Sequence, residues 1–147
     1  MLRIAAPWLL PIDGPPVPDG AVLVDEAGKI VAVGPATSVP VPERAQQLTL
    51  SDAALIPGLV NTHTHLELTG FAGMVEEADF WEWILHVIKI KAARLEEEFF
   101  LQAQAGIRAS WAAGVTTICD TGSTGQVIAA LKDLGASGIA HHEVFGA

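Results

Sequence analysis

The sequence predicts an α/β protein in which a parallel sheet follows a shorter β-rich segment. After residue 53, short β-branched runs alternate with longer segments of helical periodicity, in the order strand, helices, strand, helix, strand. That order is typical of βα units and a parallel sheet. Before residue 53, Pro and Gly separate short apolar runs, which indicates strands and turns. We therefore expect two regions, a β-rich segment over residues 1–52 and an α/β region over residues 53–147.

Short strands are expected throughout the β-rich segment. One apolar run occupies residues 3–10, and two alternating apolar runs flank the Ala-Gly pair at residues 27–28. A small turn of this kind between alternating runs predicts a β-hairpin. Residues 45–50 are expected to add a further strand.

The α/β region is expected to open with a buried strand over residues 54–65, followed by a Gly-containing loop over residues 66–78. Asp79 has Glu82 three positions further on, which is the spacing of a capping box and predicts the start of a helix. Apolar residues then recur at helical spacing and predict one buried stripe. The stripe contains Phe80, Trp83, Ile84, Val87 and Ile88.

A second helix is expected over residues 97–113, and a β-branched strand over residues 115–119 follows it at once. Ser123 and Gln126 repeat the capping-box spacing before a third helix that should end near Gly135. The last eleven residues predict another strand.

Charge and composition limit the function classes. The chain has 17 acidic and 8 basic side chains and a net charge of −9, without a Lys/Arg-rich run. It therefore lacks the electrostatic footprint of a protein that binds nucleic acid or an anionic membrane. Half of the residues are hydrophobic, but no apolar run reaches the roughly 18 residues of a membrane span.

A cytoplasmic setting is expected. The single cysteine cannot build a disulfide framework, which fits a reducing compartment. Pro7 and Pro11 interrupt the apolar N-terminus, and no small-residue cleavage pattern follows, so a signal peptide is not indicated.

Two histidines one residue apart follow the first apolar run of the α/β region. Side chains alternate faces along a strand, so His63, His65 and Glu67 are expected to share one face at the strand's carboxyl end. Neutral imidazole suits zinc, iron and nickel better than magnesium or calcium. The pattern predicts that His63 and His65 bind one divalent metal ion, although surface or core histidines can share the same spacing.

The run at residues 57–67, PGLVNTHTHLE, resembles the signature of the amidohydrolase superfamily, in its cytosine-deaminase, chlorohydrolase and aminodeoxyfutalosine-deaminase-like branch. The β-rich segment before it, the run AAGVTTICDTGST and the run EVFG resemble the opening third of that family. The resemblance implies a TIM-type (β/α)8 barrel with a metal at its mouth, and a small β-sandwich built from both chain ends.

The resemblance also implies a reaction. In such enzymes the metal, most often zinc and otherwise iron, manganese or nickel, activates a water that attacks a carbonyl or amidine-like carbon. Further histidines on the fifth and sixth strands and an aspartate on the eighth, which relays the proton, complete the site. The reactions implied are hydrolytic deamination of an aminated heterocycle, dechlorination or opening of a cyclic amide. The partner implied for the complete enzyme is therefore a small-molecule substrate.

The length of the chain departs from this pattern. A barrel of this type needs about 250 residues, and at about 30 residues per βα unit residues 53–147 supply about three of the eight units. The later histidine ligands and the general-base aspartate are therefore expected beyond residue 147. The chain is interpreted as the N-terminal part of a metal-dependent hydrolase. Alone, it is expected to be inactive. A homo-oligomer is compatible with this interpretation. The alternatives are a non-catalytic metal-binding or interaction fragment, and one half of a split enzyme.

Two glutamates are candidates for substrate binding. Glu67 stands at the exit of the metal-binding strand, where it equally fits a solvated loop carboxylate. Glu143, in the run EVFG, resembles the family's third-strand acidic residue.

The remaining polar residues have simpler interpretations. His86 is expected to be a solvated surface residue. His141 and His142 are neighbours in a strand, so one should be packed and the other exposed. Asp120 and Ser123 are expected to cap and turn the chain.

Overall fold

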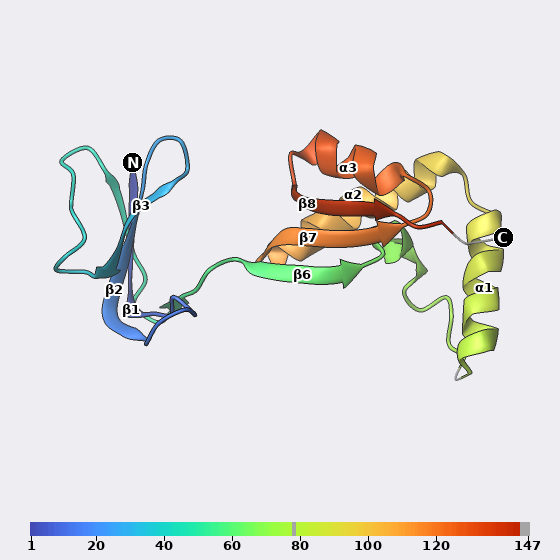
Figure 1. Ribbon diagram of the computed structural model, residues 1–147, viewed down its shortest axis with the longest axis horizontal. Helices are drawn as coiled ribbons and strands as arrows, with labels where there is room; N and C mark the ends of the chain where they lie inside the picture. Colours follow the sequence, from blue (N-terminus) through green and yellow to red (C-terminus); the bar gives the residue numbers. More distant parts are fainter. Residues whose placement is uncertain (78, 145–147) are drawn as a thin grey trace. The chain divides into compact units, whose positions relative to one another are not determined.

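The computed structural model describes residues 1–77 and 79–144, and its contacts divide the chain into two compact units, Met1–Pro57 and Gly58–Ala147 (Figure 1). The division lies five residues after the predicted boundary. Each helix in the described ranges is too short or too polar to cross a membrane.

The first unit is one mixed β-sheet. Its strands are β1 (Leu2–Leu9), β2 (Val17–Val24), β3 (Ile30–Pro35), β4 (Gln46–Thr49) and β5 (Ala54–Leu55). The order is β3-β2-β1-β4, with β5 beside β1; β2 is antiparallel to both β1 and β3, whereas β4 and β5 run parallel to β1. The predicted hairpin is confirmed as β2 and β3. A second sheet layer, which a β-sandwich needs, stays a prediction.

The hairpin turn explains why this segment reverses direction between β2 and β3. Asp25 Oδ1 accepts hydrogen bonds from the backbone N–H groups of Ala27 and Lys29, at 2.9 Å each. Gly28 has a φ of 79°, in the left-handed region that glycine adopts without a steric penalty. Ala21 and Leu23 of β2 form a small buried cluster with Val39.

The second unit is a three-stranded parallel sheet with helices, as the strand and helix order predicted. Its elements are β6 (Leu59–Thr64), the 3₁₀-helix η1 (Leu66–Phe71), α1 (Phe80–Ala92), α2 (Glu96–Ala112), β7 (Val115–Gly122), α3 (Gln126–Leu134) and β8 (Ser137–His142). The sheet order is β6-β7-β8, and both pairs are parallel. The α/β class is therefore confirmed.

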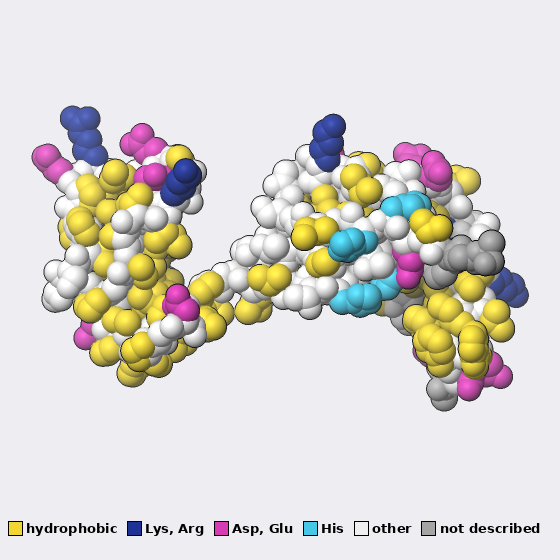
Figure 2. Space-filling model, in the orientation of Figure 1, with side chains coloured by type: hydrophobic (Ala, Val, Ile, Leu, Met, Phe, Trp, Pro, Cys, Tyr) yellow, Lys and Arg dark blue, Asp and Glu magenta, His cyan; other side chains and the backbone are white. Residues whose placement is uncertain are grey.

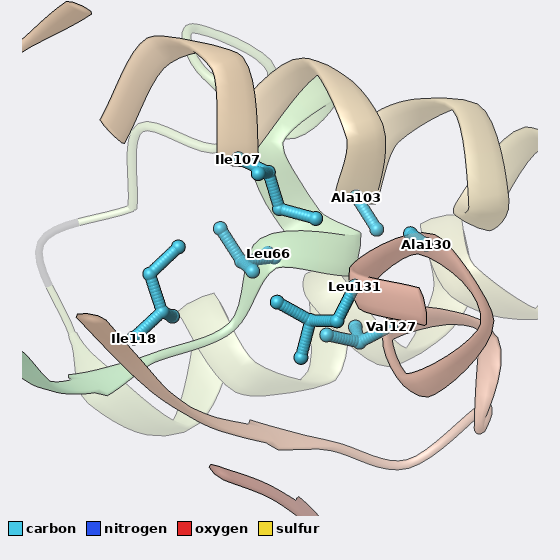
Figure 3. Packing of buried hydrophobic residues seen from close by; sticks show 7 residues of the cluster. All are labelled: Leu66, Ala103, Ile107, Ile118, Val127, Ala130 and Leu131. Carbon is cyan, nitrogen blue, oxygen red and sulfur yellow. The ribbon is translucent and has the colours of Figure 1, made fainter. Parts of the chain in front are cut away.

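Helices α2 and α3 pack with η1 over one face of this sheet, and a single apolar cluster joins them (Figure 3). Its buried members are Leu66, Ala103, Ile107, Ile118, Val127, Ala130 and Leu131. Side chains that point away from this cluster are open to solvent, since Val60 is 60% and Ile139 is 61% exposed. The prediction that residues 54–65 form one buried strand is wrong: β5 belongs to the first sheet, and β6 pairs with β7 on one side.

Three local expectations differ from the structure. Residues 66–78, expected as a loop, contain η1. The predicted apolar stripe of α1 is buried at Val87, but Phe80 is 65% and Ile88 54% exposed. Helix α3 is preceded by Gly125 with a φ of 77°, and no side chain caps it, so the predicted Ser123 cap is wrong.

Helix α1 begins at its predicted cap. Asp79 Oδ1 accepts hydrogen bonds from the backbone N–H groups of Trp81 at 2.8 Å and Glu82 at 3.1 Å. These N–H groups have no carbonyl partner within the helix, so the carboxylate satisfies donors that would otherwise depend on water.

Replacing Asp79 by alanine should lower the free energy of unfolding by about 1 kcal/mol, because both cap hydrogen bonds are lost. Urea denaturation followed by circular dichroism measures the change. Asp79→Asn, which keeps an acceptor oxygen, is the matched control and should lose less. Equal losses in the two variants would show that the cap hydrogen bonds do not stabilise α1.

Gly138 allows β8 to approach β7 closely. A Cβ built on Gly138 would overlap the carbonyl oxygen of Ile118 and lie 3.0 Å from its carbonyl carbon. The two residues are register partners, so the clash would fall on backbone that cannot move without breaking the parallel pairing.

Gly138→Ala should therefore destabilise the chain by roughly 1–3 kcal/mol, the usual cost of overpacking. The exposed neighbour Ser137 provides a control, and Ser137→Ala should leave the melting temperature nearly unchanged. Thermal unfolding of the two variants decides the question: a Gly138→Ala chain as stable as wild type would contradict the close approach of the two strands.

Candidate functional site

The three parallel strands end at one edge of their sheet, and the polar residues singled out in the sequence gather there. Thr64 of β6 is in register with Asp120 of β7, and Thr121 of β7 is in register with His141 of β8. Figure 2 shows histidine side chains on the surface over these strands. Ligand sites of parallel α/β folds lie at the carboxyl ends of the strands, so this edge is the candidate site.

His63 and His65 lie close together at the end of β6. Their ring centroids are 5.2 Å apart and the ring planes are inclined by 81°. The register of β6 with β7 shifts between Asn61 and Thr64, an irregularity that can redirect side chains. The backbone N–H of His63 donates to Asn61 Oδ1 at 3.2 Å. His63 is exposed and His65 is half-buried.

The spacing of the two rings fits two ligands of one metal ion. With zinc–nitrogen bonds of about 2.0–2.1 Å and tetrahedral geometry, two imidazole ring centres lie roughly 5 Å apart. Within residues 1–77 and 79–144, no group of three or more His, Cys, Asp or Glu side chains is placed to hold a metal. Metal binding by His63 and His65 stays a prediction.

Glu67 is fully buried, so the interpretation as a solvated loop carboxylate is wrong. Its Oε1 forms an ion pair with Lys91 and accepts the backbone N–H of Ser123 at 3.2 Å. Its Oε2 accepts the backbone N–H of Thr124 at 3.1 Å and the Thr124 hydroxyl at 2.5 Å. Burial raises the pKa of Glu67, but the hydrogen bonds from Lys91, Thr124 and Ser123 together outweigh it and lower the pKa. Substrate contact by Glu67 stays a prediction.

Asp120 is also fully buried, near the end of β7, so its expected capping role is wrong. Its Oδ2 accepts the backbone N–H of Leu66 at 2.7 Å and so ties β7 to the start of η1. Its Oδ1 has no hydrogen-bond partner among the described residues. Burial raises the pKa of Asp120, and the Leu66 N–H and the nearby His65 only partly oppose this effect.

Two residues of this site, Lys91 and Thr124, were not predicted from the sequence. The hydrogen bond from the Leu66 N–H to Asp120 was not predicted either. Lys91 is 24 residues and Thr124 57 residues from Glu67, so no local pattern links them. Asp120 had one available signal, because it directly follows a β-branched run that ends at the same edge as the two histidines.

The other three histidines of the chain are His86, His141 and His142. His86 is partly exposed, with 38% of its side chain accessible to solvent, as expected of a surface residue. Its Nδ1 lies 2.5 Å from Glu77 Oε1, a contact that the sequence did not predict. His86 lowers the pKa of Glu77. His141 and His142 are both exposed, which corrects the prediction that one is packed.

Glu143 follows β8 directly at the edge of the sheet. It is half-buried, and its backbone N–H donates to the carbonyl oxygen of Gly122 at 2.9 Å. A role in substrate binding stays a prediction for this residue.

A cavity of about 460 Å³ opens beside His65, between η1 and α1. This volume lies within the range of small-molecule pockets, which are mostly apolar with a few polar groups. The lining residues are Thr64, His65, Leu68, Thr69, Phe71, Ala72, Gly73, Val75, Trp83 and Val87.

Proteins with similar sequences are deaminases of adenosine-type compounds. The chain is 31% identical over 130 residues to a 5-methylthioadenosine/S-adenosylhomocysteine deaminase of Symbiobacterium thermophilum, covering 87% of this chain and 30% of that protein. It is 34% identical over 73 residues to a 5'-deoxyadenosine deaminase of Methanocaldococcus jannaschii, covering 50% of this chain and 17% of that protein. The chain thus spans less than a third of the length of either relative.

Solved structures share the fold. An atrazine chlorohydrolase of Arthrobacter aurescens in complex with zinc matches with a TM-score of 0.81 and 21% identity, over 97% of this chain and 35% of that one. A Helicobacter pylori aminofutalosine deaminase in complex with methylthio-coformycin matches with a TM-score of 0.80 and 20% identity, over 100% of this chain and 36% of that one.

The family assignment follows from the sequence itself. The model of the amidohydrolase family matches residues 54–142, which is more than half of the chain and includes the His63–His65 pair and all three strands of the parallel sheet. The chain therefore belongs to the amidohydrolase family, a family of hydrolases.

Proposed function

We propose that this chain carries part of the metal site of a hydrolase that deaminates an aminated heterocycle. The observation that carries the proposal is the pair of imidazole rings at the end of β6, 5.2 Å apart, which fits two ligands of one tetrahedral ion. Membership of the amidohydrolase family supports it. Zinc is the proposed metal, with iron, manganese or nickel as other candidates.

The substrate class is proposed from the relatives. Their names describe deamination of 5-methylthioadenosine, S-adenosylhomocysteine and 5'-deoxyadenosine. An adenosine that is modified at the 5' position is therefore the proposed substrate class. The cavity beside His65 supports this class, because Leu68, Phe71 and Trp83 give it apolar walls next to the proposed metal ligands.

Each residue has a defined part in the proposed reaction. His63 and His65 would hold the ion through neutral ring nitrogens. When bound, the ion supplies a water of lowered pKa as the nucleophile. Glu143 is proposed to contact the substrate from the end of β8. Further histidine ligands and a general-base aspartate, which the family resemblance implies, would complete the site.

A test of the metal ligands compares zinc binding by three forms of the 147-residue chain. The His63→Ala/His65→Ala variant should bind zinc far more weakly than wild type. The loss should exceed the roughly 10–100-fold that removing a residue hydrogen-bonded to a metal ligand costs. The matched control is His141→Ala/His142→Ala, which also removes two histidines from the same edge of the sheet and should keep wild-type affinity. Isothermal titration calorimetry measures all three dissociation constants. Equal zinc binding by wild type and the first variant would refute the ligand assignment.

The reaction itself is tested by ammonia release from 5-methylthioadenosine, S-adenosylhomocysteine and 5'-deoxyadenosine, using the full product of the gene that encodes this chain. Release should require zinc, stop on chelation and be absent in the His63→Ala variant. Zinc-loaded enzyme that leaves every such adenosine unchanged would contradict the proposed deamination, even if the ligand assignment holds.

A further inference from the structure

We propose that Glu67 is a positioning residue, whose buried carboxylate fixes the segment that carries His65 against α1 and the connection between β7 and α3. The importance of His65 in this inference rests on the proposed function. Glu67 stands two residues after His65, in η1, and its side chain is fully buried. This assignment differs from the sequence prediction that Glu67 contacts the substrate.

The donors to Glu67 come from two segments that are distant in sequence. Lys91 lies near the end of α1, and Ser123 and Thr124 lie between β7 and α3. Lys91 Nζ also donates to the Ser123 hydroxyl at 2.7 Å, so the three donor residues are joined to one another as well. One carboxylate therefore holds η1, α1 and the β7–α3 connection together.

The number of donors leaves little capacity for a substrate. A carboxylate offers about four acceptor positions. Lys91 Nζ, the backbone N–H groups of Ser123 and Thr124, and the Thr124 hydroxyl are four donors within 3.2 Å. With all of its oxygens engaged and no exposed surface, Glu67 is suited to hold the protein together rather than to bind a ligand.

A second carboxylate fixes the residue between His65 and Glu67. Asp120 Oδ2 accepts the Leu66 backbone N–H at 2.7 Å, and the Leu66 side chain is 3% exposed within the core between α2 and α3 (Figure 3). His65 is therefore followed by two successive residues whose positions are set by long-range contacts. No hydrogen bond of its own ring is found among the described residues, so the position of its backbone limits where the ring can lie.

Gly122 lies beside both carboxylates, and its lack of a side chain leaves room for them. A Cβ built at this position would lie 3.0 Å from Asp120 Oδ1, 3.0 Å from Glu67 Oε2 and 3.2 Å from a methyl group of Val127. Any larger residue would press on both carboxylates. The absence of a side chain at 122 is thus part of the same arrangement.

The test uses the 147-residue chain with Glu67→Gln and Lys91→Met, which weaken the contact from either side. Glu98→Gln is the matched control, because it breaks the Arg94–Glu98 ion pair on the surface of α2. The first readout is the ¹H–¹³C NMR signal of the His65 ring in metal-free protein at constant pH. Both Glu67→Gln and Lys91→Met should shift or broaden this signal, and Glu98→Gln should leave it as in wild type.

The second readout is metal binding. Zinc affinity should fall by about 10–100-fold in Glu67→Gln and Lys91→Met, the usual effect of losing support for a metal ligand, and the visible spectrum of the cobalt-substituted chain should change. If melting temperatures fall while the His65 signal, the affinity and the spectrum stay as in wild type, Glu67 is only structural and the inference is overturned. If Glu67→Gln does not fold, Lys91→Met decides alone, since Lys91 is partly exposed and away from the strand.

The outcomes separate this inference from the proposed function. A wild-type chain that binds no zinc removes support for the proposed metal site, while the His65 ring signal still decides whether Glu67 positions that residue. If the wild-type chain binds zinc, and both variants keep its zinc affinity and its His65 ring signal, the metal site stands and the positioning role is refuted.

Discussion

A carboxylate buried in protein is stable only when other donors replace the water that it loses, and Glu67 meets this condition with donors from α1 and from the β7–α3 connection. The positions of Lys91 and of the turn before α3 depend on this requirement. The charge of Glu67 keeps Lys91 directed inward, and the two backbone N–H groups of Ser123 and Thr124 fix the turn that precedes α3. Without these donors the carboxylate would be an uncompensated buried charge, which is far more costly than the loss of a surface ion pair.

The same requirement explains which parts of the second unit could be predicted from sequence. The Asp79 cap and the bounds of α2 depend on residues a few positions apart, so their patterns were sufficient. Ser123 has the same local capping pattern, yet its backbone N–H is engaged by Glu67, 56 residues away. The chain then enters α3 through Gly125 instead. A long-range electrostatic contact thus prevailed over a local preference worth about 1 kcal/mol.

The candidate site divides in a similar way. The spacing of His63 and His65 is a local property of one strand, and it was visible in the sequence together with the end of the sheet where it lies. The burial of Glu67 and Asp120 was not visible, because a carboxylate after a strand is more often solvated. Nor could exposure of β6 be read from its apolar residues, since burial depends on what packs against each face of the sheet. For that reason Val60 is exposed although its residue type suggests a core position.

The two buried carboxylates at the strand ends, Glu67 and Asp120, differ in the charges and donors around them. Glu67 has Lys91 as its counter-charge, whereas Asp120 is buried with one oxygen bonded to the Leu66 N–H and the other unpartnered among the described residues. The Leu66 N–H and then His65 favour the ionised form of Asp120, and burial and Glu67 oppose it. In the proposed metal-loaded protein, a divalent cation held by His63 and His65 would add positive charge near Asp120 and so favour its ionised form further. The ring spacing of His63 and His65 is the geometric feature that supports the proposed metal site, because the described residues place no group of three or more His, Cys, Asp or Glu side chains to hold an ion.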